Sequence, residues 1–294
     1  MPIQEFAPAK LNLYLHITGR RADGYHDLDS LVAFASIGDE IKLQAASDFA
    51  FEIVGPQAGA LAHENQDDNL VVRAAQSLAR LTGNDLDAHL TLIKNLPVAS
   101  GIGGGSSDAA AALRALARHW GLAKDDPRIL EAAAQHGQDV PVCVRVESNY
   151  MTATGVEPAP ELPRTAIVLV NPGKGLPTPA VYKEYREGGD PFSPLSRLSG
   201  APATVEELVI ALKLRSNDLY APACRLMPEI AEIITALCST DQCLLARMSG
   251  SGATCFGIYA DNDAAERAAE KIRAAYPAWW VRAGEIAVPR DAGA

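Results

Sequence analysis

The sequence predicts a mixed α/β (α+β) fold divided into two domains, and three observations support this prediction. The chain has 294 residues, 48% of them apolar, which is enough to form more than one core. Residues 88–120 read as a strand, a glycine-rich loop and a helix. Residues 165–286 follow the order strand, helices, two strands, helix, strand, which is the split β-α-β-β-α-β pattern. A segment rich in proline and glutamate, 155–165, separates these halves, so we expect domains at 1–160 and 161–294.

Composition excludes several classes of protein. Charged residues make up 21% of the chain, and the net charge of −10 argues against a non-specific partner for nucleic acid or for an anionic membrane. The five cysteines form no C-x-x-C pair, which favours reduced thiols in a cytoplasmic protein. Neither a signal peptide nor an apolar run of ~18 residues is present, so we expect no membrane span. The sequence contains no feature that indicates an oligomeric state.

The first predicted strand covers residues 9–16, where apolar and polar residues alternate. Period two indicates one buried face, so Lys10 and Asn12 should point the same way. A solvated strand lysine is the more ordinary interpretation of Lys10 from this segment alone. A turn-rich connector follows and ends at Tyr25 and His26, which could stack on and hydrogen-bond a flat ring, or could simply cover the core.

The next elements are a hairpin and a helix. Alternation at residues 41–45 and 49–53 predicts two paired strands joined by a short turn. Asp68 or Asn69 can cap a helix that runs to about Leu81 and ends at Gly83.

The middle of the chain contains its densest run of glycine, between Pro97 and Ser107. Glycine allows close approach of a ligand, and the start of the following helix exposes unpaired N–H groups, so this segment predicts an anion site, most often one for phosphate. The segment fits neither the P-loop, which needs a lysine before the serine, nor the dinucleotide fingerprint, which needs glycine in place of Ser106. The alternative is a flexible loop before a helix capped by Ser106 or Ser107.

A second helix should begin at Asp126-Pro127 and run to about His136, before a strand at residues 142–146. Asp139 would then lie in the turn between them, where it could project into a cleft or, more ordinarily, form an Asx turn.

The second half should begin with a strand at 165–170 and a loop at 172–203. A capping box formed by Thr204 and Glu207 opens the helices, which continue over 217–226 and 228–237. Strands at 244–248 and 254–259 enclose the small residues Ser249–Ala253, which favour a ligand-facing loop over a plain tight turn. A helix at 261–274 and a strand at 279–286 complete the chain.

Three motifs taken together carry a resemblance to a known family. They are Pro8-Ala9-Lys10-Leu11-Asn12, the segment from Pro97 to Ser107, and Ser249-Gly250-Ser251-Gly252-Ala253. Their order and spacing resemble the galactokinase, homoserine kinase, mevalonate kinase and phosphomevalonate kinase (GHMP) superfamily. Gly24-Tyr25-His26 and Asp139-Val140-Pro141 add a resemblance to the branch that acts on 4-diphosphocytidyl-2-C-methyl-D-erythritol.

The resemblance implies an N-terminal domain like domain 2 of ribosomal protein S5, a C-terminal ferredoxin-like domain, and a cleft between them. It implies transfer of the γ-phosphoryl group of ATP, bound with Mg²⁺ through unknown protein ligands, to the 2-hydroxyl of a small substrate that carries a cytidine diphosphate. It further implies that Asp139 is the base and that Lys10 lies beside it. Such a lysine would keep the carboxylate ionised and counter the charge of the transferred group.

The resemblance also assigns binding residues. The expected ATP contacts are Pro97, Val98, Ala99, Ser100, Gly101, Ile102, Gly103, Gly104, Gly105, Ser106 and Ser107, with Asn69 and Lys94. The expected substrate contacts are Asn12, Tyr25, His26, Tyr182, Gly250, Ser251 and Gly252, with Tyr25 and Tyr182 on either side of the cytosine. Asp108 would stabilise the start of its helix as a dipole and capping residue.

Two other functions compete with this one. Another GHMP small-molecule kinase would have no need for two aromatic rings on either side of a nucleotide base. A non-catalytic nucleotide-binding regulator would need neither Lys10 nor Asp139.

Overall fold

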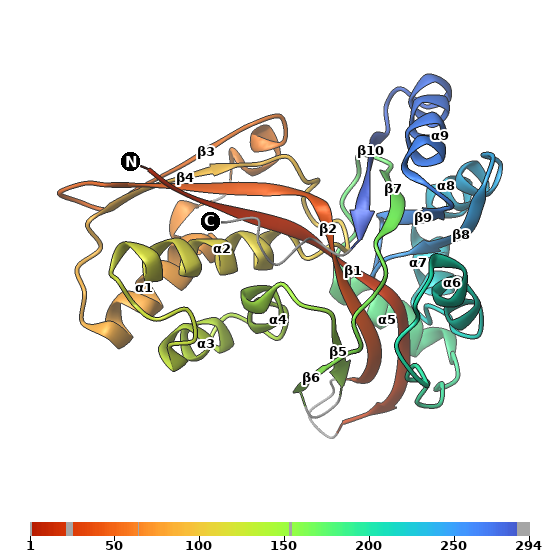
Figure 1. Cartoon of the computed structure of the whole chain (residues 1–294), viewed down its shortest axis with the longest axis horizontal. Coiled ribbons are helices and arrows are strands. Elements are labelled where there is room, and N and C mark those ends of the chain that lie inside the picture. Colours follow the sequence, from red (N-terminus) through yellow and green to blue (C-terminus); the bar gives the residue numbers. More distant parts are fainter. Residues whose placement is uncertain (1, 22–25, 64, 153–154, 287–294) are drawn as a thin grey trace.

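The computed structural model describes residues 2–21, 26–63, 65–152 and 155–286, arranged as two α/β halves side by side (Figure 1). The strands are β1 (Ile3–Arg20), β2 (His26–Ala45), β3 (Ala50–Val54), β4 (Ala88–Ile93), β5 (Asn149–Thr152), β6 (Gly155–Pro158), β7 (Thr165–Asn171), β8 (Cys243–Met248), β9 (Cys255–Tyr259) and β10 (Trp280–Ile286). The helices are α1 (Leu70–Thr82), α2 (Gly104–His119), α3 (Pro127–Ala134), α4 (Asp139–Arg145), α5 (Thr178–Gly188), α6 (Val205–Lys213), α7 (Tyr220–Leu226), α8 (Glu229–Cys238) and α9 (Asn262–Ala275), with short 3₁₀ turns at Ala58–Leu61 and Gln66–Asp68. The predicted α/β fold class is confirmed.

The antiparallel pair β1–β2 runs through both halves of the molecule (Figure 1). Its first part packs with α1 and α2 in the N-terminal core, and Leu11 and Leu13 pack against Ile167 and Phe256 of the C-terminal half. Since both faces are covered, the expectation of one solvated face on β1 is wrong: even Tyr14 is fully buried.

In the N-terminal half the strands lie in the order β3-β4-β2. β4 pairs antiparallel with residues 40–45 of β2, and β3 pairs parallel with the far edge of β4. The predicted hairpin of residues 41–53 is therefore wrong, because β4 occupies the edge that β3 would have used. The α1 prediction is confirmed: the Asn69 side chain accepts from the Val71 N–H, and Gly83 ends the helix with φ 74°.

The C-terminal half contains an antiparallel sheet in the order β10-β7-β9-β8. In chain order this is 4-1-3-2, the arrangement that the split β-α-β-β-α-β pattern predicts. The sheet joins the N-terminal half at Ile286, which pairs with Ala35 of β2. The expected loop 172–203 is wrong in its first part, because α5 lies inside it. No helix in the described ranges has both the length and the apolar character needed to cross a membrane.

Candidate active site

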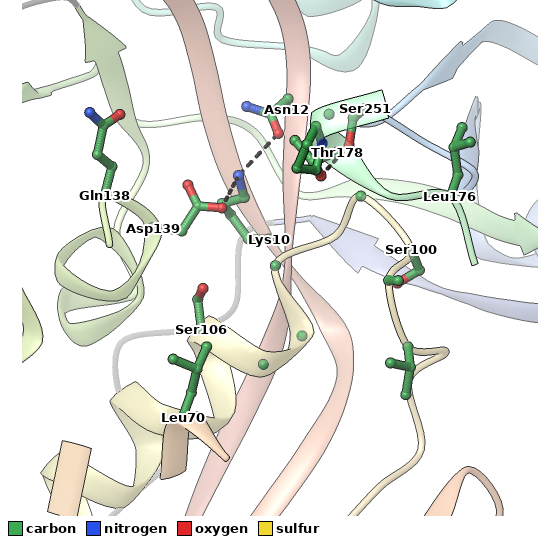
Figure 2. A pocket seen from close by; sticks show the side chains of 18 of the residues that line it. Lys10, Asn12, Leu70, Ser100, Ser106, Gln138, Asp139, Leu176, Thr178 and Ser251 are labelled. Atoms are coloured by element: carbon green, nitrogen blue, oxygen red, sulfur yellow. Dashed lines mark hydrogen bonds and ion pairs between the residues drawn. The ribbon is translucent and has the colours of Figure 1, made fainter. Parts of the chain in front are cut away.

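A cleft of about 810 Å³ lies where the two halves meet (Figure 2). Its lining includes β1, the start of β2, the glycine-rich segment, the start of α4, one face of α5 and the loop between β8 and β9. These elements come from widely separated parts of the chain. The cleft therefore gathers the three motifs that the sequence analysis singled out.

Lys10 and Asp139 form an ion pair in this cleft. The Lys10 Nζ lies 3.2 Å from the Asp139 Oδ2 and 3.1 Å from the Asn12 Oδ1 (Figure 2). Only 6% of the Lys10 side chain is exposed, against 36% for Asp139, so the interpretation of Lys10 as a solvated lysine is wrong. The ammonium is fixed between two acceptors, whereas the carboxylate retains access to the cleft.

Asp139 is the first residue of α4 and not a turn residue before a strand. The strand expected at 142–146 is wrong, because residues 139–145 form a helix that buries Val140, Val142 and Cys143. A short apolar run does not distinguish a buried strand from a buried helix, and proline is tolerated in the first helical turn, where Pro141 lies. An acid at the first position of a helix is also favoured by the helix dipole.

The glycine-rich segment packs closely against its surroundings. The Lys10 N–H donates to the Ile102 carbonyl oxygen at 2.9 Å. Gly103 has φ 62°, and a Cβ there would lie 3.1 Å from the Lys10 Cβ. At Gly101 a Cβ would lie 2.5 Å from the carbonyl oxygen of Ser249, so part of the glycine content serves contact between two loops.

The start of α2 faces the cleft. The helix begins at Gly104 with Gly103 as its N-cap residue and without a side-chain cap, so Ser106 and Ser107 belong to its first turn. The first N–H groups of a helix have no acceptor within it, which together with the dipole favours an anion at this end. The expected ATP residues that line the cleft are Asn69, Lys94, Pro97, Val98, Ala99, Ser100, Gly101, Gly103, Gly104, Gly105 and Ser106. Ile102 and Ser107 lie outside the lining, both fully buried.

Beneath this helix start lies a buried charge cluster that the sequence analysis did not find. The Lys94 Nζ lies 2.6 Å from Asp39 and 2.6 Å from Asp108, and all three side chains are nearly inaccessible. Asp39 also accepts from the backbone N–H groups of Asn95 and Leu96. Burial raises the pKa of Asp108 to about 8, against the lowering effect of Lys94. The Asp108 side chain therefore accepts a hydrogen bond from Lys94 and does not cap its own helix, so the expectation that it mainly caps the helix is wrong.

The opposite side of the cleft holds the residues expected to contact the substrate. Asn12 is oriented by two bonds: its Nδ2 donates to the Ser30 hydroxyl at 2.8 Å, and its backbone N–H donates to the Ser249 hydroxyl at 3.1 Å. Gly250 and Ser251 line the cleft. Gly252 lies off the lining, where a Cβ would meet the Met248 sulfur at 2.8 Å.

A cluster of aromatic rings lies on this same side of the cleft. The His26 ring stacks on Tyr182 with centroids 5.2 Å apart, and its edge meets Tyr185. Burial, followed by the charges of Arg186 and Arg20, lowers the pKa of His26, which favours a neutral imidazole that both donates and accepts. Tyr25, the other expected ring, lies outside the described residues.

Sequence reasoning missed Thr178, whose hydroxyl lies 2.7 Å from that of Ser251 inside the cleft (Figure 2). It was missed because α5 was read as part of a loop. The buried residues Val181 and Tyr185 stand four apart, which is the spacing of a helix face and the signal that could have revealed α5.

Comparison with known proteins gives two family matches. Residues 69–146 match the GHMP kinases N terminal domain, and residues 206–278 match the GHMP kinases C terminal family. A 4-diphosphocytidyl-2-C-methyl-D-erythritol kinase from Rhodospirillum rubrum is 48% identical over 96% of this chain and 92% of its own. One from Cereibacter sphaeroides is 50% identical over 95% of this chain and 97% of its own.

Solved structures agree with these matches. A crystal structure of 4-(cytidine 5'-diphospho)-2C-methyl-D-erythritol kinase superposes with a TM-score of 0.79 at 32% identity, covering 98% of this chain and all of the other. A homoserine kinase from Cytophaga hutchinsonii superposes with a TM-score of 0.70 at 16% identity, covering 96% of this chain and 94% of its own, which shows a shared fold alone.

Proposed function

Because this chain belongs to the GHMP kinases, and within them to the 4-diphosphocytidyl-2-C-methyl-D-erythritol kinases, we propose that it phosphorylates the 2-hydroxyl of 4-diphosphocytidyl-2-C-methyl-D-erythritol with ATP. The observation that carries the chemistry is the ion pair between Lys10 and Asp139 at 3.2 Å, beside the open start of α2. A kinase of this kind supplies one step of isoprenoid biosynthesis by the non-mevalonate route.

Each residue of the site then has a role. Asp139 takes the proton from the substrate hydroxyl, which requires it to lie within hydrogen-bond reach of that group. Lys10, fixed by Asn12, keeps Asp139 ionised and offsets negative charge on the transferred phosphoryl group. The N–H groups at the start of α2 bind the triphosphate, with Asn69 and the segment from Pro97 to Ser106 around it.

Lys94 contributes to the ATP site through its position under the bound phosphates. Its ammonium already has two carboxyl partners and lies 3.2 Å from where a Cβ of Gly104 would be. It therefore supports the first turn of α2 from below, while its charge is balanced within the buried cluster.

Magnesium would enter with ATP. Among the described residues, no group of three acidic, histidine or cysteine side chains is placed to hold a metal ion. Mg²⁺ usually keeps several waters and binds through one or two carboxylates and the phosphates of its substrate. The side chains of the cleft thus fit a metal carried by the nucleotide, which neutralises charge on the phosphates.

The proposal is tested by ADP release. The purified protein with MgATP should release ADP with 4-diphosphocytidyl-2-C-methyl-D-erythritol, and the product should carry one additional phosphate by mass spectrometry. Mevalonate and homoserine, offered at the same concentration, should give only the blank rate. Turnover of either alcohol in preference to the cytidylyl substrate would assign the chain to another kinase activity, and no release with any of them would favour a non-catalytic nucleotide-binding protein.

A further inference from the structure

Arg114 connects three elements of the N-terminal half through one side chain. It lies on α2, which packs against both β1 and α4 (Figure 1). On β1, its Nε donates to the Glu5 carboxylate at 3.1 Å and its Nη2 donates to the Phe6 carbonyl oxygen at 2.6 Å. On α4, its Nη1 donates to the Cys143 carbonyl oxygen at 2.9 Å. Only 15% of the side chain is exposed, so the planar guanidinium is held in one orientation between a strand and a helix.

The two elements that Arg114 connects carry the two charged residues of the ion pair in the cleft. Phe6 precedes Lys10 by four residues on β1. Cys143 follows Asp139 by four residues on α4, which is about one helical turn. A strand and a helix are rigid over such short lengths, so the contacts of Arg114 affect the separation of Lys10 and Asp139.

The bond to Cys143 satisfies a group that α4 itself leaves without a partner. The helix has seven residues, and the carbonyl groups of the last four residues of a helix have no N–H partner within it. The Cys143 carbonyl is one of these. Arg114 gives it a charged donor at the end of the helix where a cation is favoured, so the last turn of α4 is held to α2 and β1.

The position of Asp139 depends on the position of α4. Among the described residues, the Lys10 ammonium is the only hydrogen-bond or ion-pair partner of the Asp139 carboxylate. Lys10 is held independently of α4, because its N–H donates to the Ile102 carbonyl oxygen and its ammonium donates to the Asn12 side chain. A shift of α4 would therefore move the carboxylate and leave the ammonium in place.

Resting on the proposed function, we infer that Arg114 is a positioning residue for phosphoryl transfer. It holds α4 against β1, so that Asp139 stays within reach of both Lys10 and the substrate hydroxyl. Arg114 is absent from the lining of the cleft and acts only through α4. A misplacement of about 1 Å at a reacting group can lower turnover by about 10²-fold, so a contact outside the cleft can control the rate.

The kinetics of two matched variants test the inference. Arg114→Met keeps the aliphatic stem and suits a helix, but it loses all three bonds. We expect kcat for the cytidylyl alcohol to fall by about 10²-fold. The KM for ATP should stay close to that of the wild type, because the first turn of α2 is unchanged.

Arg118→Met is the matched control. Arg118 lies about one turn further along α2 and also pairs with Glu5, at 2.7 Å. Among the described residues it forms no hydrogen bond or ion pair with α4. Its kcat should therefore stay within about twofold of the wild-type value, as for an ordinary surface substitution.

Labelling of Cys143 reports the position of α4 without turnover. The thiol is fully buried, and burial raises its pKa to about 12, so it should resist N-ethylmaleimide in the folded wild type. Mass spectrometry of the Cys143 peptide should show faster labelling in Arg114→Met but not in Arg118→Met. Cys255, fully buried in the C-terminal half, is the control for global unfolding and should stay protected in all three proteins.

Unchanged kcat in Arg114→Met would overturn the inference, and so would a loss of turnover with Cys143 still protected. If that variant does not fold, Arg114→Lys replaces it. Lysine keeps the charge but not the planar fork that reaches three acceptors at once, so the same pattern should appear in smaller measure, and wild-type kcat would again contradict us. If the wild type releases no ADP with the cytidylyl alcohol, the proposed function fails, whereas Cys143 labelling still decides whether Arg114 holds α4.

Discussion

The ammonium of Lys10 has two acceptors within 3.2 Å and almost no contact with solvent. Asp139 shares it but remains one-third exposed on the cleft side. The exposed oxygen is free to approach a substrate hydroxyl, whereas the position of the carboxylate is set by the lysine. The pair therefore combines a fixed positive charge with an accessible carboxylate.

Asp139→Asn tests this division of roles. The amide keeps the shape and its oxygen can still accept from the Lys10 ammonium, but it cannot take the hydroxyl proton. We expect kcat to fall by about 10²–10⁴, the range for loss of a general base, with little change in the KM for ATP. Steady-state kinetics would check this, with far-UV circular dichroism as the control for folding. Turnover close to the wild-type rate would leave Asp139 with only the role of a first-turn helix residue.

At the scale of elements, the buried cluster of Asp39, Lys94 and Asp108 joins β2, the residue after β4 and α2 beneath the proposed phosphate site. Two carboxyl groups share one ammonium, and among the described residues the Asp108 Oδ1 has no hydrogen-bond partner. Burial and the charge of Asp39 therefore oppose ionisation of Asp108, even with Lys94 present, and raise its pKa to about 8. In the unfolded chain the same carboxyl loses its proton near pH 4.

This pKa difference predicts how stability depends on pH. Between about pH 4 and pH 8 the folded protein holds a proton that the unfolded chain has lost, so Asp108 makes the free energy of unfolding fall as the pH rises through this range. Asp108→Asn should flatten this slope, so the difference in Tm between pH 5 and pH 8 should shrink. Asp39→Asn is the contrast: its carboxylate also accepts two backbone N–H groups, so its loss should lower Tm at both pH values. An equal Tm difference in Asp108→Asn and wild type would contradict the prediction.

Elements with strong local signals were predicted from the sequence, and elements decided by distant contacts were not. The ends of α1 follow from Asn69 and Gly83, which act within one helical turn. The pairing of β3 depends on β4, which lies more than 30 residues further along the chain. The motifs located the cleft, but Asp39 gave no signal, because its role depends on Lys94 and on two N–H groups more than 50 residues away.

On the scale of the whole molecule, the expected division of the chain into two domains at residue 160 remains a prediction. The first strand pair, β1–β2, nevertheless runs through both halves of the molecule. Leu15 and Ile17 of β1 belong to the core that contains Val168 and Ile233, and Ile286 near the other end of the chain pairs with Ala35. The Ser249 hydroxyl further connects the halves, since it accepts from the Asn12 N–H and donates to the Gly101 carbonyl oxygen. A segment that forms part of both cores couples their stabilities.

We therefore expect the two halves to unfold in a single transition. Trp120 follows α2 and packs against the N-terminal core, and Trp279, just before β10, packs against the C-terminal core, so these two can report each half separately. Trp280 cannot, because its Nε1 donates to the Asn95 carbonyl oxygen of the other half. In urea, Trp120→Phe/Trp280→Phe, which keeps Trp279, and Trp279→Phe/Trp280→Phe, which keeps Trp120, should give fluorescence curves that each coincide with far-UV circular dichroism, the usual test of two-state behaviour. Fluorescence and circular dichroism midpoints that separate within one variant would mean that the halves fold independently. In that case β1 and β2 would connect two cores without coupling them, and the geometry of Lys10 and Asp139 would depend on docking of preformed halves and not on their joint folding.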